Sequence, residues 1–245
     1  MKCSVSQLVL AAAMTIVLLG GATISYAKPV TVSSYDMPNG YGVSVGGEYN
    51  YWDAGYTGSG DKNTDGAFLS GGVGKLTDGV VATKSWEYND ASGLAHTDQN
   101  LLGTGPYVGW TWGDPTLTFH FADLVNINSI TFYVDNPGLD RYGKPRGGVA
   151  APKGFTIGGH FYAADSPSPG IGPLAITLSD LALDDLKDLT LTINRNLSPD
   201  TFWVFVSEVT FDDGQNPAPV PEPSSFLLMG AGIFGMALWR RRSKG

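Results

Sequence analysis

Cysteine is almost absent from this chain. Its 245 residues include a single cysteine, Cys3, in an N-terminal segment that we expect to be removed on export. The exported protein then has no disulfide, so burial, hydrogen bonds and bound metal are left to stabilise its fold.

Positive charge is also scarce. The chain has 15 Lys and Arg residues against 23 Asp and Glu residues. Five of the cations and one of the anions lie in the two terminal segments described below, which leaves a body with ten cations, 22 anions and a net charge of about −12. Such a surface repels nucleic acid and other acidic polymers unless a cation bridges them. The same acidity favours calcium, which prefers oxygen ligands.

Signals for catalysis are lacking as well. The three histidines are widely spaced, at residues 96, 120 and 160, and form no metal-binding pair such as H-E-x-x-H. Residues 42–46 match the G-x-S-x-G pattern of a nucleophile elbow, but no predicted helix follows them. We therefore expect no enzymatic activity, and a secreted hydrolase or lyase is the least favoured class.

Residues 1–27 have the pattern of a secretory signal peptide. Lys2 precedes an apolar run, and Ser25 and Ala27 provide the small residues expected at the −3 and −1 positions of a cleavage site. We exclude this segment from the fold. Residues 28–213 are long enough for one extracellular domain with its own core. A proline-rich linker follows at residues 214–219 and is expected to be stiff and extended.

The other end of the chain predicts a transmembrane helix at about residues 224–239, followed by Arg240, Arg241 and Arg242. This uncharged segment has 16 residues, fewer than the roughly 20 that cross a bilayer core. Flanking residues or a thinner membrane can cover the shortfall. The arginines favour a cytoplasmic C-terminus. By themselves these residues are also consistent with an ordinary C-terminal membrane anchor.

Pro221, Glu222 and Pro223 stand directly before this segment. With the apolar run and the arginines, they make residues 220–245 resemble the PEP-CTERM sorting signal of Gram-negative bacteria. The resemblance implies that a membrane protease called exosortase processes the tail. It also implies an inner-membrane intermediate and delivery to the cell surface or the extracellular matrix.

The body has the pattern of an all-β protein. Polar and apolar residues alternate with a period of two in four segments, residues 116–121, 129–134, 174–178 and 189–193. Residues 201–211 are apolar on both faces, as in a strand buried between two layers. Residues 179–188 favour a single helical turn, with Ser179 as its cap. Short strands with abundant glycine and proline predict an antiparallel β-sandwich.

Three parts of the body resemble the galactose-binding-like, or discoidin-type, β-sandwich, which is a jelly roll. They are Leu-Thr-Asp-Gly at residues 76–79, Tyr-Val-Gly-Trp at 107–110 and Trp-Val-Phe-Val-Ser-Glu-Val at 203–209. The resemblance implies that Trp86 and Trp110 pack in the core. The chain departs from the usual Ser-x-Asp-Gly turn, because residues 158–161 read Gly-Gly-His-Phe at the corresponding place.

Many members of that fold hold a structural calcium ion between the Asp-Gly loop and the late glutamate. Carried over to this chain, the resemblance makes Asp78 and Glu208 the side-chain ligands, with loop carbonyls completing an oxygen shell. The residues alone leave another interpretation, in which Asp78 makes an Asx turn and Glu208 is solvated. Residues 61–66 match the first half of an EF-hand loop, but the twelfth position is Gly72, so a polar turn is favoured.

Aromatic residues in loops are the candidates for ligand binding. Trp52, Tyr88, Trp112 and Tyr142 lie in Gly-rich or polar segments. Flat rings stack on the apolar faces of sugars while they stay partly hydrated. Burial is the alternative for each of them.

These observations predict an exported, surface-sorted β-sandwich that binds or organises carbohydrate or exopolysaccharide in the envelope or matrix. The negative body favours a neutral glycan, or an acidic one bridged by calcium. The alternative is a structural surface or aggregation protein with no small ligand.

Overall fold

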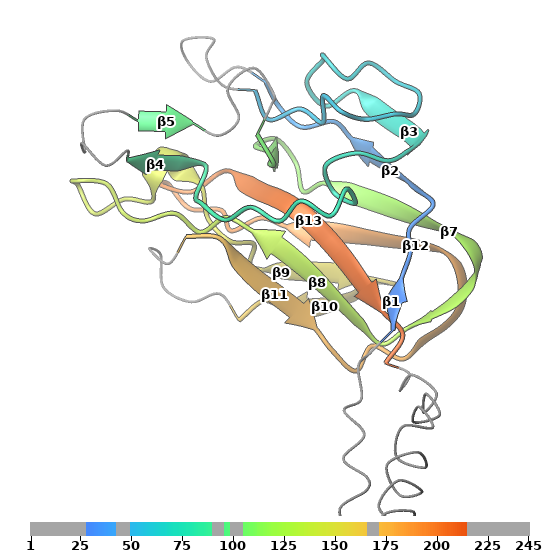
Figure 1. Cartoon of the computed structure of the whole chain (residues 1–245). Helices are drawn as coiled ribbons and strands as arrows, with labels where there is room; N and C mark the ends of the chain where they lie inside the picture. Colours follow the sequence, from blue (N-terminus) through green and yellow to red (C-terminus); the bar gives the residue numbers. More distant parts are fainter. Residues whose placement is uncertain (1–27, 43–49, 90–95, 99–104, 166–171, 215–245) are drawn as a thin grey trace, which may run out of the picture. The chain divides into compact units, whose positions relative to one another are not determined.

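The computed structural model describes residues 28–42, 50–89, 96–98, 105–165 and 172–214. Residues 29–214 form one compact unit (Figure 1). Within the described ranges the regular structure is β-strand, apart from one short 3-10 turn, η1 (Arg146–Gly148). No helix in those ranges is long and apolar enough to cross a membrane. The predicted signal peptide, membrane segment and sorting tail lie outside the described residues.

One sheet has five antiparallel strands. Its path runs through β1 (Pro29–Val30), β13 (Val204–Asp212), β8 (Ser129–Val134) and β11 (Leu174–Leu178), and β6 (Val108–Trp110) also pairs with β13. The long β13 is therefore central, with β8 along one side and both β1 and β6 along the other.

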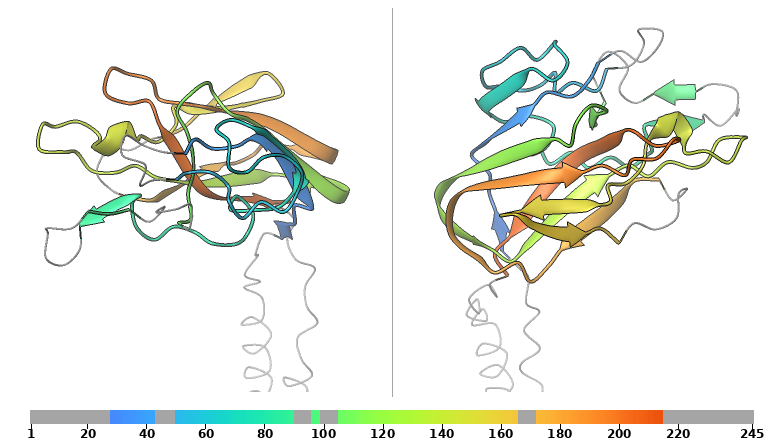
Figure 2. Two further views of the ribbon diagram at one scale, coloured as in Figure 1. Left: turned by 90° about the horizontal axis from the view of Figure 1, so that it is seen from above. Right: turned by 180° about the vertical axis from the view of Figure 1, so that it is seen from behind.

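The second sheet has six antiparallel strands (Figure 2). Their order is β10 (His160–Ala163), β9 (Gly154–Ile157), β12 (Leu183–Asn194), β7 (Thr116–Ile127), β2 (Ser34–Pro38) and β3 (Phe68–Gly72). A separate two-stranded sheet is made by β4 (Glu87–Asn89) and β5 (His96–Asp98).

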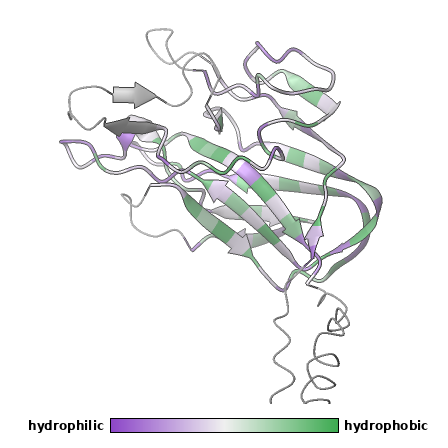
Figure 3. Cartoon of the chain, viewed as in Figure 1, coloured by the Kyte–Doolittle hydropathy of each residue, from purple (hydrophilic) through white to green (hydrophobic). Residues whose placement is uncertain are grey.

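The core lies between the two large sheets. Along β7 the apolar residues Leu117, Phe119 and Phe121 are buried, while the intervening residues face outward. Figure 3 shows the resulting alternation of hydrophobic and polar bands along the strands. Rings from the two sheets meet in the middle, where Phe132 of β8 stacks on Phe155 of β9 with centroids 3.9 Å apart. The predicted antiparallel all-β fold is thus confirmed.

Two strand predictions match the structure from end to end, those for residues 129–134 and 174–178. The predicted helical turn at residues 179–188 is wrong, because β12 already begins at Leu183. Asp180, Ala182 and Asp185 have positive φ values of 56°, 46° and 53°. Asp180 and Ala182 turn the chain between β11 and β12, and Asp185 lies within β12 where its register with β7 shifts. Such left-handed conformations are incompatible with a right-handed helix.

The strand register places the chain ends at one end of the sandwich, and the loops that follow β6 and β8 and precede β13 at the other. Pro29 pairs with Asp212, so both connections to the chain termini leave from the same end. Val204, at the start of β13, pairs with Trp110 at the end of β6. Eight residue steps along β13 separate these two positions, which corresponds to roughly 25 Å.

Candidate functional site

Three loops meet at the end of the sandwich opposite the chain termini, and we call them the tip loops: residues 111–115, 137–148 and 195–203. Arg195 joins two of them. Its backbone N–H and Nε donate to Oδ1 of Asp114 at 3.1 and 3.3 Å. Its guanidinium also donates to the carbonyl oxygens of Thr111 and Phe202. Arg195 is buried, so these contacts fix the two loops against each other.

The remaining loop, residues 137–148, which we call the third tip loop, is held by Lys144, whose Nζ lies 2.5 Å from Oδ1 of Asp200. Asp140 orders this loop internally, since its Oδ1 accepts hydrogen bonds from the backbone N–H groups of Tyr142 and Lys144 at 2.8 and 2.9 Å. These bonds, first that from Lys144, lower the pKa of the Asp140 carboxyl. The loop is therefore a defined turn.

The tip loops carry two of the four aromatic residues that the sequence nominates for ligand binding. Trp112 is 75% exposed and Tyr142 is 70% exposed. Leu197 and Phe202 are also exposed on the same three loops. Sequence reasoning missed Phe202 because it assigned residues 201–211 to a strand, whereas β13 begins only at Val204.

The other two nominated aromatics lie elsewhere. Trp52 is partly buried, and its Nε1 donates to Oδ1 of Asp65 at 2.6 Å. The same carboxylate oxygen accepts the backbone N–H of Gly42 at 2.6 Å, so Trp52 helps to hold the polar turn at residues 61–66. Tyr88 lies on β4, and its side chain is outside what the structure describes. Ligand binding by these two residues stays a prediction.

The two tryptophans that were assigned to packing are buried. Trp110 is 1% exposed, and its Nε1 donates to the carbonyl of Pro38 at 2.8 Å. Trp86 is 9% exposed and belongs to a small second cluster with Tyr51 and Phe205. Both packing predictions are confirmed.

The Asp-Gly loop and the late glutamate lie side by side. Glu208 is 4% exposed, and its Oε2 accepts the backbone N–H of Gly79 at 3.0 Å. A β-bulge between Val206 and Glu208 shifts the register of β13, and Ser207 accepts the N–H of Ala82 from the same covering segment. The bulge therefore directs two consecutive side chains toward residues 79–82.

Asp78 is exposed and makes the Asx turn that the sequence offered as one interpretation. Its Oδ1 accepts the backbone N–H of Val80 at 2.8 Å. Glu208 is not solvated as that interpretation supposed. Its pKa is raised to about 7, mainly by burial and also by the charge of Asp78, while hydrogen bonds from the N–H groups of Gly79 and Asp78 partly offset the rise.

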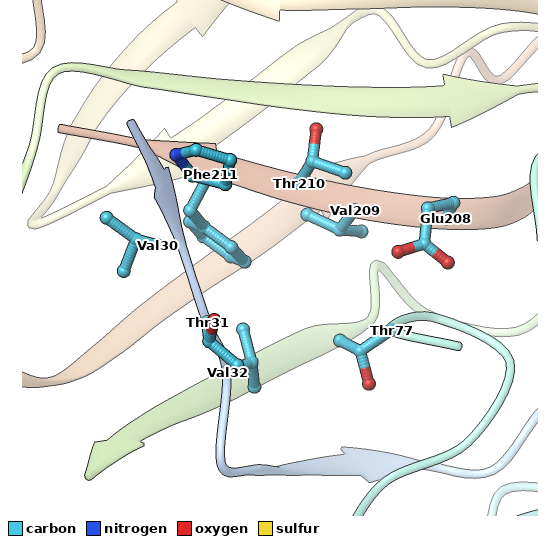
Figure 4. A pocket seen from close by; sticks show the side chains of 9 residues that line it. Val30, Thr31, Val32, Thr77, Glu208, Val209, Thr210 and Phe211 are labelled. Carbon is cyan, nitrogen blue, oxygen red and sulfur yellow. The ribbon is translucent and has the colours of Figure 1, made fainter. Parts of the chain in front are cut away.

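A pocket of about 160 Å³ adjoins Glu208. Val30, Val32 and Phe211 supply apolar walls, and Glu208 and Thr77 supply polar atoms (Figure 4). The hydroxyl oxygen of Thr77 is buried and has no hydrogen-bond partner in the described part of the chain. The Thr77 hydroxyl and the Glu208 carboxylate thus line one pocket, and the charge of Asp78 acts on Glu208 from the neighbouring loop.

Carboxylate and hydroxyl oxygens are the kinds of ligand that calcium prefers, but this place supplies only two carboxylates. Among the described residues there is no group of three or more His, Cys, Asp or Glu side chains that could hold a metal. A calcium ion here would need backbone carbonyls or the Thr77 hydroxyl in addition to Asp78 and Glu208.

His120 has a role that sequence reasoning missed. It lies on the outer face of the six-stranded sheet, with Nδ1 2.6 Å from Oδ1 of Asp188 and Nε2 3.2 Å from Oδ2 of Asp36. The hydrogen bond with Asp188, and then that with Asp36, raise the pKa of His120. Three neighbouring strands, β2, β7 and β12, are thus bridged by one imidazole.

Comparison with protein families gives one match in the tail of the chain and one in its body. Residues 219–242 match the PEP-CTERM protein-sorting motif. The tail is a PEP-CTERM sorting signal. The motif implies export, processing by the membrane protease exosortase, and membrane-anchored sorting before display at the cell surface.

The body of this PEP-CTERM protein matches the DS-like domain of discoidin domain-containing receptors 1 and 2 over residues 31–139. The chain therefore carries a discoidin-like domain, and the matched part runs from the segment before β2 into the third tip loop. Both families are non-catalytic. No curated protein matches the chain.

Proposed function

We propose that this PEP-CTERM protein binds carbohydrate of the cell envelope or matrix through its tip loops. The observation that carries the proposal is the exposure of Trp112, at 75%, on a loop that Arg195 and Asp114 hold in place. An exposed indole on a fixed loop can stack on a sugar without losing much conformational freedom on binding. Tyr142, on the third tip loop, offers a second ring.

The position of the tip loops supports this role. They lie at the end of the domain opposite Pro29 and Asp212, where the chain continues toward the signal peptide and the sorting tail. A ligand at the tip is therefore remote from the attachment of the domain to the rest of the chain.

Binding at such a site is expected to be weak for one sugar unit. A single stacked ring contributes about 1 kcal/mol, by analogy with aromatic pairs. Many copies on one surface would raise the overall affinity for a repeating polymer, because later contacts become intramolecular. This matches a protein that is sorted to the cell surface.

A structural calcium ion at Asp78 and Glu208 is the second part of the proposal. The two carboxylates repel each other, and the charge of Asp78 contributes to the raised pKa of Glu208. A divalent cation would relieve this repulsion and would give the Thr77 hydroxyl a partner. The ion would stabilise the segment at residues 76–82 and would not contact the tip loops.

The binding test uses the full chain, purified in a non-ionic detergent and passed over immobilised polysaccharides. Trp112→Ala should lower retention about fivefold for each 1 kcal/mol lost, with an unchanged melting curve. Phe68→Ala is the matched control, because Phe68 is 66% exposed on the edge strand β3 and outside the tip loops.

Three results would redirect the proposal. Equal loss of fold and binding in Trp112→Ala would mean that the lost retention follows from unfolding and not from a missing ring contact. Absence of retention on every envelope polysaccharide, even for the wild-type chain, would favour the structural surface protein. Cleavage of a polysaccharide would favour a secreted polysaccharide-active enzyme.

A further inference from the structure

The two ends of the sandwich differ in charge. At the end of the sandwich from which the chain termini leave, three turns contain six aspartates and one cation, Lys187. These turns are residues 122–128, 179–187 and 212–214. The tip loops contain four cations and three aspartates. The tip is thus slightly positive, although the body as a whole carries about −12.

Most of the charged side chains of the tip loops are engaged with one another. Lys144 pairs with Asp200 and Arg195 pairs with Asp114. Arg141 differs, because no carboxylate among the described residues pairs with it. It is exposed, and its Cζ lies 4.7 Å from the centroid of the Tyr142 ring.

This geometry leaves a planar donor group beside an exposed ring. Stacking on Tyr142 orients the guanidinium and costs none of its N–H donors. A guanidinium donates two parallel hydrogen bonds to a carboxylate or a sulfate, and such charge-assisted bonds are stronger than those between neutral groups. The neighbouring ring suits the apolar face of the sugar that bears the anion.

We propose that the tip loops select an acidic polysaccharide, with Arg141 binding the carboxylate or sulfate and Tyr142 contacting the sugar ring. The inference rests on the proposed carbohydrate binding and adds the chemical class of the ligand. It departs from the expectation of a neutral glycan, or of an acidic one bridged by calcium, because that expectation averages charge over the whole body.

Screening by salt explains why the charge near Arg141, and not the net charge of the body, determines which polymer is attracted to the tip. At physiological ionic strength the Debye length is about 8 Å, whereas the two ends of β13 are roughly 25 Å apart. The aspartates at the end of the chain termini therefore contribute little to the potential at Arg141. An acidic chain that approaches the tip meets the cations of the three loops first.

The experiment compares polymers that differ only in charge. The full chain in non-ionic detergent is passed over immobilised polygalacturonate and over its methyl ester, and over dextran sulfate and dextran. We expect retention on an acidic polymer to exceed that on its neutral counterpart at least fivefold and to fall as salt rises. Binding to only one of the two acidic polymers identifies the anion.

Two variants assign the preference to Arg141. Arg141→Gln should reduce retention on the acidic polymer about fivefold and leave weak retention on the neutral one unchanged. Lys187→Gln is the matched control, since it removes an exposed cation from the opposite end of the domain. Both variants are expected to melt like the wild-type chain.

The outcomes separate this inference from the proposal on which it rests. Equal wild-type retention on the acidic and neutral polymers would overturn the acidic preference and leave carbohydrate binding intact. Wild-type behaviour of Arg141→Gln would overturn the role of this residue. Loss of all retention by the wild-type chain would overturn both proposals.

Discussion

The carboxylate of Glu208 accepts a hydrogen bond from the backbone N–H of Gly79 at 3.0 Å, across a separation of 129 residues in the sequence. This contact attaches the Asp-Gly loop to the central strand β13. Because Glu208 is buried, its carboxylate is shielded from water, and the charge of the exposed Asp78 adds to the effect of burial in raising the pKa of Glu208.

Calcium should therefore stabilise the domain. A ligand that binds only the folded state contributes RT ln(1 + [L]/Kd), about 2.7 kcal/mol at a hundredfold excess over Kd. We expect the melting temperature to rise in millimolar calcium by roughly 5 °C or more and to fall with a chelator. Asp78→Ala should abolish this response in a thermal melt.

Two control variants distinguish the loss of calcium binding from the loss of the Asx turn at Asp78. Asp78→Asn keeps an oxygen that can accept the N–H of Val80 but removes the charge, so it too should lose the calcium response. Asp61→Asn changes an acidic residue in the polar turn at residues 61–66 and should keep the response. Identical melts of the wild-type chain with calcium and with chelator would remove this site.

The ion pair between Arg195 and Asp114 should contribute more to stability than the pair between Lys144 and Asp200. The Arg195 side chain is 7% exposed, whereas those of Lys144 and Asp200 are 55% and 41% exposed. Asp114→Ala removes the charged hydrogen-bond acceptor of a buried guanidinium and should cost about 2 kcal/mol. Lys144→Ala should cost less than about 1 kcal/mol. Urea unfolding measures both, and equal costs would contradict the expectation.

His120 should make stability depend on pH. Its folded-state pKa is raised above the ordinary 6.5 by hydrogen bonds with Asp188 and Asp36. The stabilising contribution is therefore fully present below pH 6.5 and is lost as the pH rises through the raised pKa. His120→Gln should melt roughly 2 °C below wild type at pH 6, and the difference should vanish near pH 9.

The quantity to follow is the difference in melting temperature between the wild-type chain and His120→Gln, because other groups also titrate. Burial raises the pKa of Asp135 to about 6 and that of Glu208 to about 7, and it lowers the pKa of Lys75 to about 8. These contributions cancel in the difference, since His120→Gln leaves all three groups in place. A constant difference from pH 6 to pH 9 would rule out the proposed protonation of His120.

The sorting motif gives the fourth prediction. Replacement of Arg240, Arg241 and Arg242 by neutral residues should impair membrane retention, because the cytoplasmic positive charge is lost. Disruption of residues 221–223 should leave an unprocessed form. Fractionation and immunoblotting of the membrane and surface pools measure both effects. Processing and export of either altered tail at the wild-type level would contradict the assignment.

Local pattern was sufficient for the alternating strands and for the tail. In β8 and in residues 116–121 of β7 the side of each residue follows from a period of two, and burial of every second residue needs no knowledge of the partner strand. The sorting signal is likewise contiguous, so it can be recognised without any fold. The prediction of a helical turn at residues 179–188 is wrong because the left-handed residues there reverse the chain, so that β11 pairs with β8 and β12 pairs with β7.

The candidate site was predictable only in part. Polar surroundings nominated Trp52 and Trp112 equally, but the exposure of a ring depends on segments that are distant in the sequence. Asp65 engages the indole of Trp52, while Arg195 fixes the loop of Trp112 and leaves its ring exposed.

The sequence by itself determined the sorting signal, the alternation within several strands and the nomination of Asp78 and Glu208. Only the tertiary structure decided that Glu208 is buried beside Asp78, that His120 lies between two aspartates and that Arg141 stands in a positive tip. The physical reason is that periodicity assigns a residue to a face of a strand, whereas charge, burial and hydrogen bonding at a site depend on which distant strands and loops converge there.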